Sequence, residues 1–199
     1  MKFLRLLSLF AALLVTSCDE KATIPGEAPN SLSDADFERL LEEAVDYDSL
    51  DSRDHLQYRG NKPYSGWVKR MYDSGRVRTL LPLKRDGNPD GPQTMWHENG
   101  QKKDEYTYKD GKMHGPFTEW HENGQKAEDG TYKDGKEDGP FTLWYENGQR
   151  KREDTWKDGK LHGPFTEWHK NGQKKGEATY KDGKFHGPVT TWHENGKRK

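Results

Sequence analysis

Apolar residues in the first part of the chain follow the spacing of a helix. Between residues 33 and 47 they fall on one helical face, at Phe37, Leu40, Leu41, Ala44 and Val45. Ser33, with Asp36 three residues later, favours a helix start at this point. We expect one amphipathic helix over residues 33–47 that caps the structure following it. A substrate-binding helix is the alternative.

From residue 91 the pattern becomes a repeat of 24 residues. Tryptophan recurs at this step, as Trp96, Trp120, Trp144, Trp168 and Trp192. Each unit also holds an Asn-Gly and an Asp-Gly dipeptide, which favour type I′ hairpin turns because they tolerate positive φ at both central positions. Two such turns per unit predict two antiparallel strands. The expected fold is mostly β, an extended antiparallel β-meander of hairpin repeats with one short N-terminal helix.

A proline helps to place the strands within each unit. Because Pro116 has no N–H for a strand ladder, we expect regular pairing to begin near Phe117, in strands of about five residues. Alternation along this strand divides its side chains between two faces, Phe117, Glu119 and His121 against Thr118 and Trp120. Both faces should therefore carry aromatic residues.

Two aromatic ladders are candidates for a binding surface. The first is the tryptophan series, and the second comprises Tyr108, Tyr132, Trp156 and Tyr180. Equivalent residues of successive units lie two strands apart, about 9.6 Å. We expect both ladders mainly to hold a narrow sheet together, and stacking of a ligand on them is the alternative.

The residues of one unit resemble a known repeat. Gly-Pro-Phe-Thr-Glu-Trp-His-Glu-Asn-Gly-Gln-Lys, continuing to Thr-Tyr-Lys-Asp-Gly-Lys, is similar to the MORN repeat variant of bacterial proteins often grouped as an antitoxin family of toxin–antitoxin systems. The resemblance covers residues 56–199, as about six units, and begins with a divergent unit at Tyr64-Ser65-Gly66-Trp67. It implies an array connected with membranes, lipids or protein scaffolding.

The N-terminus has the pattern of an exported lipoprotein. Lys2 and Arg5 precede ten apolar or small residues, too few to span a bilayer. The following Val-Thr-Ser-Cys resembles the bacterial lipobox, which implies lipidation of Cys18, the only cysteine; an ordinary cleavable signal followed by a free cysteine is the alternative. We expect a lipoprotein signal peptide at 1–17, a flexible lipidated tether at 18–32, a capping helix and linker at 33–55 and the repeat domain at 56–199.

Composition restricts the possible functions. Only 29% of the residues are hydrophobic and 34% are charged, so a conventional two-layer core is not expected. Residues 61–199 hold 27 basic and 22 acidic residues, which is a poor electrostatic footprint for nucleic acid. The sequence has no nucleophile elbow and no phosphate-binding glycine loop. We therefore expect neither an enzyme nor a cofactor.

Histidine recurs at two positions of the repeat, which raises the question of a metal site. The two series are His97, His121, His169 and His193, and His114, His162 and His186. The same positions hold Tyr145, Asp90 and Asp138 in other units, and no unit supplies the dense ligand set that zinc requires. We expect a polar ladder on a solvated face and no metal site.

Taken together, these patterns predict an extracytoplasmic lipoprotein anchored by lipid in a bacterial cell membrane and facing the periplasm or the cell exterior. Its repeat sheet should bind a protein or an envelope component without catalysis, with no nucleic-acid partner. Two alternatives stay open. One is an antitoxin-like inhibitor of a toxin or effector protein, and the other is a glycan-binding or hydrolytic envelope protein.

Overall fold

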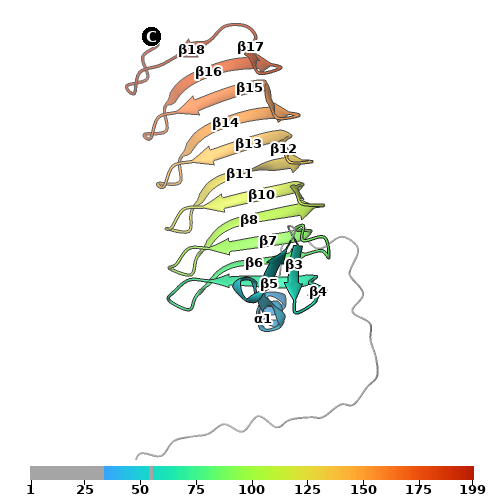
Figure 1. The fold of residues 1–199 in the computed structure, drawn as a ribbon. Helices are drawn as coiled ribbons and strands as arrows, with labels where there is room; N and C mark the ends of the chain where they lie inside the picture. Colours follow the sequence, from blue (N-terminus) through green and yellow to red (C-terminus); the bar gives the residue numbers. More distant parts are fainter. Residues whose placement is uncertain (1–33, 54–55) are drawn as a thin grey trace, which may run out of the picture.

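The computed structural model describes residues 34–53 and 56–199. The expected signal peptide, Cys18 and the tether lie outside these residues. In the described part, strands lie side by side in one long open sheet, with helix α1 at one end and β18 at the other (Figure 1). The prediction of a mostly β meander with a short N-terminal helix is confirmed.

The large sheet of the described residues has fifteen strands, all antiparallel to their neighbours except β1, which runs parallel to β5. They are β1 (Val45–Asp46), β5 (Gly66–Met71), β6 (Val77–Leu83), β7 (Gly91–Trp96), β8 (Lys102–Lys109), β9 (Lys112–Met113), β10 (Gly115–Trp120), β11 (Lys126–Lys133), β12 (Lys136–Glu137), β13 (Gly139–Trp144), β14 (Arg150–Lys157), β15 (Lys160–Trp168), β16 (Lys174–Lys181), β17 (Lys184–Phe185) and β18 (Thr190–Thr191). A smaller sheet contains β2 (Asp51–Arg53), β3 (Leu56–Arg59) and β4 (Lys62–Pro63).

The helix is shorter than the sequence predicts. α1 spans Asp34–Glu43 rather than 33–47, because the chain then enters β1 at the edge of the large sheet. The carboxylate of Asp46 next accepts a hydrogen bond from the backbone N–H of Asp48, 3.0 Å away, and caps the 3-10 helix η1 (Tyr47–Ser49). The end of the expected helix and the expected linker after it therefore contain three short elements, β1, η1 and β2.

The Asp-Gly turns adopt the predicted conformation. Asp110 and Gly111 have φ values of 50° and 75°, so both residues are left-handed, as a type I′ turn requires. The later units repeat this geometry at Asp134, Asp158 and Asp182. Aspartate and glycine tolerate this region better than most residues, and the dipeptide therefore fixes the turn locally.

The expectation of type I′ turns at the Asn-Gly dipeptides is wrong. At Asn99-Gly100 only Gly100 has a positive φ, 89°. The N–H of Gly100 donates to the C=O of His97, whose own N–H donates to the C=O of Gln101. The loop therefore has three residues and ends in a left-handed glycine. The Asn99 side chain favours this form through two hydrogen bonds. Its amide oxygen accepts from the N–H of Gln101, and its amide nitrogen donates to the C=O of Glu122 in the next unit.

Strand pairing also starts earlier than Phe117. β10 pairs with β11 along its whole length from Gly115, whereas its pairing with β8 involves only Thr118 and Glu119. The missing N–H of Pro116 therefore leaves no gap in the ladder with β8. As a result the two main strands of this unit have six and eight residues rather than about five.

Side-chain alternation gives the large sheet two different faces. We call the face that carries Leu80, Thr94 and the tryptophan series the Trp face. We call the opposite face, which carries Leu83, Phe117 and Phe141, the Phe face. A register shift just before each tryptophan from Trp96 to Trp168 places the extra residue on the partner strand, so the tryptophan keeps its place on the Trp face.

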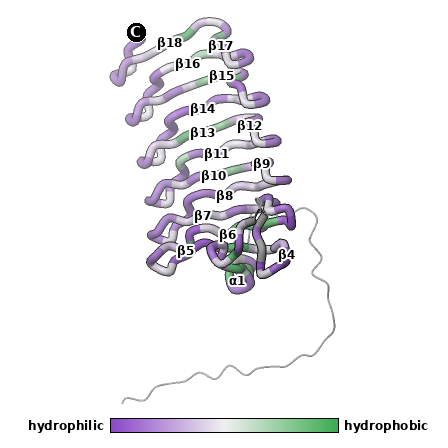
Figure 2. Tube along the Cα trace, in the orientation of Figure 1, coloured by the Kyte–Doolittle hydropathy of each residue, from purple (hydrophilic) through white to green (hydrophobic). Residues whose placement is uncertain are grey.

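The best-buried part of the core lies where the N-terminal segment folds around strand β5. On the Trp face, Leu40 of α1 and Ala44, which directly follows the helix, pack against Leu80, which is fully buried. On the Phe face, Leu50 packs against Val68 and Leu83. Since β1 pairs with β5 between these two clusters, the outer edge of the sheet is partly covered. Figure 2 shows hydrophobic residues gathered around α1 and hydrophilic turns along both edges of the repeats.

Candidate binding surface

The Trp face carries alternating aromatic and cationic side chains. The Nζ atoms of Lys102, Lys126 and Lys174 lie 6.0, 5.6 and 5.8 Å from the ring centroids of Trp120, Trp144 and Trp192. Cation–π contacts at such exposed positions contribute about 0.5–1 kcal/mol each. The five tryptophans are partly buried, and three of them, Trp120, Trp144 and Trp192, lie beside a lysine from a neighbouring strand.

Acidic side chains balance these lysines. Lys102, Lys126 and Lys174 form ion pairs with the acid three residues later, respectively Glu105, Asp129 and Glu177, and Arg150 pairs in the same way with Glu153. The cations are about half exposed, so each pair adds little to stability. The face therefore combines apolar ring surface with balanced charge, which suits recognition of a folded partner better than of a polyanion.

The Phe face has a different role, because its rings pack on one another. Phe117 and Phe141 are 4% and 3% exposed. The ring of Tyr132 packs against both, with centroid distances of 5.1 and 5.7 Å, and Trp156 lies 6.1 Å from Phe141. Tyr108 and Tyr180 also have ring neighbours, at 6.5 and 5.4 Å. The second aromatic ladder thus packs within the Phe face, and of the two ladders the tryptophan series is the better candidate for a partner surface.

Three carboxylates lie side by side on the Phe face. Asp104, Glu119 and Glu128 are cross-strand partners on β8, β10 and β11. Burial raises the pKa of Asp104 and of Glu128, and the neighbouring Glu119 raises both further. The hydroxyl of Tyr106 donates to Glu119 over 2.6 Å, and burial together with this bond raises the pKa of Tyr106. Burial likewise raises the pKa of Tyr132 to about 12.

The raised pKa of Glu128 predicts a pH-dependent effect. The unfolded chain ionises this carboxyl at lower pH than the folded chain does, so its charge destabilises the fold at neutral pH and not in acid. Since like charges on opposed strands cost about 0.2–1 kcal/mol, Glu128→Gln should raise the thermal midpoint by about 1–3 °C at pH 7.5 and leave it unchanged at pH 3. Thermal melts at both pH values measure this. Glu122→Gln, at an exposed turn, is the control; an equal rise there would contradict the explanation.

The first histidine series links units instead of forming the expected solvated ladder. His97, His121 and His169 are partly buried, and their Nε2 atoms lie 2.9, 3.2 and 3.1 Å from the C=O of the tryptophan one unit later. A carbonyl only accepts, so Nε2 carries the proton. The hydroxyl of Tyr145 donates to the C=O of Trp168 in the same way, over 2.9 Å. The position therefore requires a side chain that can donate a hydrogen bond to this carbonyl of the next unit. Histidine and tyrosine both do so, which explains why one replaces the other.

This role predicts how substitutions at His121 behave. His121→Ala leaves the carbonyl of Trp144 without this donor and should cost about 0.5–1.5 kcal/mol of unfolding free energy. His121→Tyr should cost much less, because Tyr145 makes the equivalent bond one unit later. Urea denaturation of the three proteins gives the comparison. Equal losses in both variants would show that the bond is not what the position requires.

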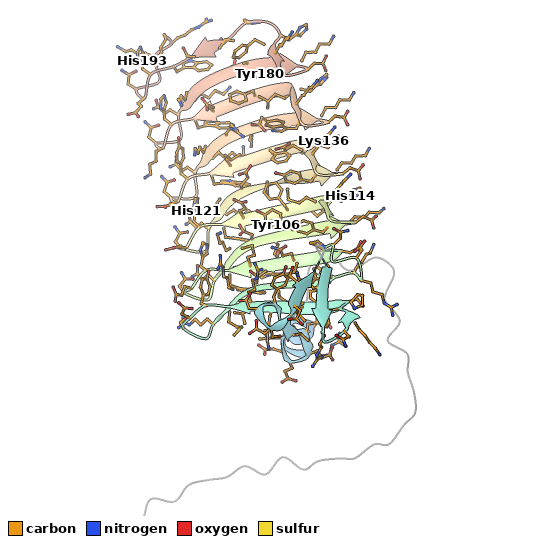
Figure 3. All side chains as sticks on the ribbon, in the orientation of Figure 1. Tyr106, His114, His121, Lys136, Tyr180 and His193 are labelled. Atoms are coloured by element: carbon orange, nitrogen blue, oxygen red, sulfur yellow. The ribbon has the colours of Figure 1, made fainter. Side chains whose placement is uncertain are left out.

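The second histidine series lies at the opposite edge, as Figure 3 shows for His114 against His121. The Nδ1 atom of His114 lies 3.2 Å from the carboxylate of Asp134, in the Asp-Gly turn of the next unit. His162 pairs with the next turn in the same manner, and in the other units Asp90 and Asp138 accept from the backbone N–H of that turn. Aspartate and histidine therefore exchange here because either can link to the following turn.

Neither histidine series forms a metal cluster in the described residues. Across 34–53 and 56–199, no three His, Cys, Asp or Glu side chains lie together in a way that could hold a metal ion. The same residues include no helix long and apolar enough to cross a membrane. Residue Cys18, the expected lipidation site, lies outside the part of the chain that the structure describes.

The comparisons with known proteins identify the repeat. Four segments match the family model of the MORN repeat variant: residues 89–110, 113–134, 137–158 and 161–182. Each segment covers the two main strands of one unit and the Asn-Gly loop between them, and ends at the aspartate of the Asp-Gly turn. No curated protein matches the chain. MORN repeats are generally non-catalytic modules that bind proteins or membranes.

Proposed function

Because the chain carries four MORN repeat variants within one open sheet, we propose that it is a non-catalytic scaffold that binds a partner protein. A lipid on Cys18 would hold it at a bacterial membrane, facing the periplasm or the cell exterior. The observation that carries the binding role is the Trp face, where a tryptophan recurs in every unit and, at Trp120, Trp144 and Trp192, lies beside a partly exposed lysine. Tryptophan is enriched at protein-binding surfaces and among the residues that contribute most to binding energy.

The rest of the surface supports this choice. Along both edges, side chains such as His97, Asn99 and His114 form hydrogen bonds between units, and on the Phe face the rings pack on one another. The balanced charge of the Trp face argues for a protein over an anionic polymer. Inhibition of a toxin or effector would use the same surface and is one form of this function.

Site-specific cross-linking tests the partner. A photoreactive phenylalanine analogue replaces Thr142, which lies on the Trp face, or Lys136, an exposed residue at the Asp-Gly edge. Irradiation of intact cells should give a protein adduct from position 142 and none from 136. Adducts that resist protease but yield to glycan-cleaving enzymes would instead favour the glycan-binding alternative. Equal protein adducts from both positions would contradict a role for the Trp face.

The anchor gives the next prediction. Cys18→Ser should move the protein from the membrane fraction to the soluble fraction, because the acylated sulfur is the proposed attachment and each buried CH₂ contributes about 0.8 kcal/mol. Labelling with a clickable fatty acid measures the modification directly. Wild type should take up the label and the variant should not. An unlabelled wild-type protein would rule out the lipoprotein assignment.

A further inference from the structure

Helix α1 already occupies one end of the Trp face. Leu40 of α1 and Ala44, which directly follows the helix, form a cluster with Leu80, and Trp67 and Trp96 pack against this cluster. Trp96 is the first member of the tryptophan series. The chain's own helix therefore shows which kind of element this face accepts at its N-terminal end.

The end of α1 is also held by a cation of the sheet. The Nζ atom of Lys69 donates to the backbone C=O of Leu41 over 2.9 Å, in the last turn of the helix, where carbonyls lack partners within the helix. The helix is acidic, with five carboxylates against one arginine over Asp34–Glu43. Apolar contact with tryptophan and polar contact with lysine thus act together in this interface.

The same combination continues beyond α1. Trp120 on β10, Trp144 on β13 and Trp192 just after β18 each have a lysine about 6 Å from the ring centroid. In the described residues, β10 and β13 pack mainly on their neighbouring strands. We infer that this part of the Trp face binds an acidic amphipathic helix of the partner protein. This inference rests on the proposed function and names the element of the partner that is recognised.

The spacing of the tryptophans fits a helix that crosses the strands. Successive members are two strands apart, about 9.6 Å, while seven residues of an α-helix rise about 10.5 Å. A helix with an apolar residue at every seventh position therefore meets one tryptophan after another with an offset of about 1 Å per unit. Acidic residues beside that stripe lie within reach of the lysines between the rings, where they would replace the weak, exposed ion pairs that these lysines make with Glu105, Asp129 and Glu177.

A matched pair of peptides tests the helix. The first is a stapled 21-residue peptide with leucines in heptad spacing and glutamates beside them, and the second has the same composition with leucine and glutamate alternating as in a strand. Tryptophan fluorescence of the full chain in detergent reports binding. We expect the heptad peptide to bind and the alternating peptide to bind at least about tenfold more weakly. Equal binding, or tighter binding of the alternating peptide, would overturn the inference in favour of an extended ligand.

Matched variants locate the binding. Thr142→Arg places a bulky side chain on the Trp face, and Gln125→Arg adds the same charge at an exposed edge turn. The heptad peptide should bind at least about tenfold more weakly to the first and unchanged to the second. Unchanged binding to Thr142→Arg would contradict the assigned face. Vesicles containing phosphatidylglycerol that displace the peptide would indicate a lipid occupant instead of a helix.

Failure of this inference can be separated from failure of the proposed function. If the heptad peptide does not bind but cross-links from position 142 still reach a protein, the helix is wrong and the scaffold function stands. If those cross-links are also lost, both are wrong. A third outcome is that the free protein forms a dimer and that Leu40→Asp abolishes this dimer. The helix on the Trp face would then be α1 of a second copy, and the inference of a separate partner protein would be wrong.

Discussion

Replacing Phe141 with alanine should lower the free energy of unfolding by about 3–5 kcal/mol. Its ring is 3% exposed and contacts rings on both sides, Phe117 at 5.5 Å, Tyr132 at 5.7 Å and Trp156 at 6.1 Å. It also lies over Gly130, where an added Cβ would come within 2.7 Å of the ring. These ring contacts make up the packing of the Phe face at this point, so their loss should be large.

The repeat supplies a matched control for this substitution. Val189 occupies the same repeat position two units later and is 50% exposed. Val189→Ala should change the unfolding free energy by no more than about 0.5 kcal/mol. Urea denaturation of both variants gives the comparison. Similar losses would contradict the claim that ring packing on the Phe face holds the units together.

The turns show which parts of the fold the sequence determines locally. The Asp-Gly turns follow from the dipeptide alone, since both residues tolerate the left-handed region. The Asn-Gly turns do not, because the same dipeptide fits either a two-residue or a three-residue loop. The Asn99 side chain selects the longer loop by bonding to the backbone of Glu122, and that partner exists only once the next unit has folded.

The histidines show the same limit for the candidate site. The acceptor of His97 is the carbonyl of Trp120, 23 residues away, and no local pattern contains it. Tyr145 was the one signal in the sequence for this role. A tyrosine in place of a histidine can still donate a hydrogen bond, but it is not a usual metal ligand, so the exchange favours hydrogen bonding over metal binding. The two aromatic ladders were visible in the sequence, but their division into a packed Phe face and a more open Trp face depends on contacts between strands.

The short N-terminal elements were missed for a different reason. β1 and β4 have two residues each and β2 has three, too few to form a periodic pattern. Their positions follow from the packing of Leu50, Val68 and Leu83 around the edge strand. The position of α1 on the Trp face is likewise a property of the assembled sheet, although the helix itself was predictable from its apolar spacing.

The central claim is that the sheet consists of interchangeable two-strand units of 24 residues. Removing residues 115–138 should preserve the fold, because the chain then resumes at Gly139, whose φ of 111° matches the 108° of Gly115. β13 then lies beside β8 in the place of β10, and His114 can pair with the turn at Asp158 as it does with Asp134. Each unit is stabilised mainly by its neighbours, so loss of one should reduce stability moderately.

Removing 12 residues should have the opposite result. Deletion of residues 115–126 takes out one strand and reverses the direction of everything that follows. The turn at Asp134 then falls at the sheet edge that carries the Asn-Gly loops. The hydrogen bonds that join successive units, such as those of Asn99 and His114, lose their partners. Circular dichroism and thermal melts of the two deletion variants decide the matter. We predict a cooperative β-sheet melt for the 24-residue deletion and loss of soluble folded protein for the 12-residue deletion; equal behaviour of the two would contradict the two-strand unit and the extended binding surface built on it.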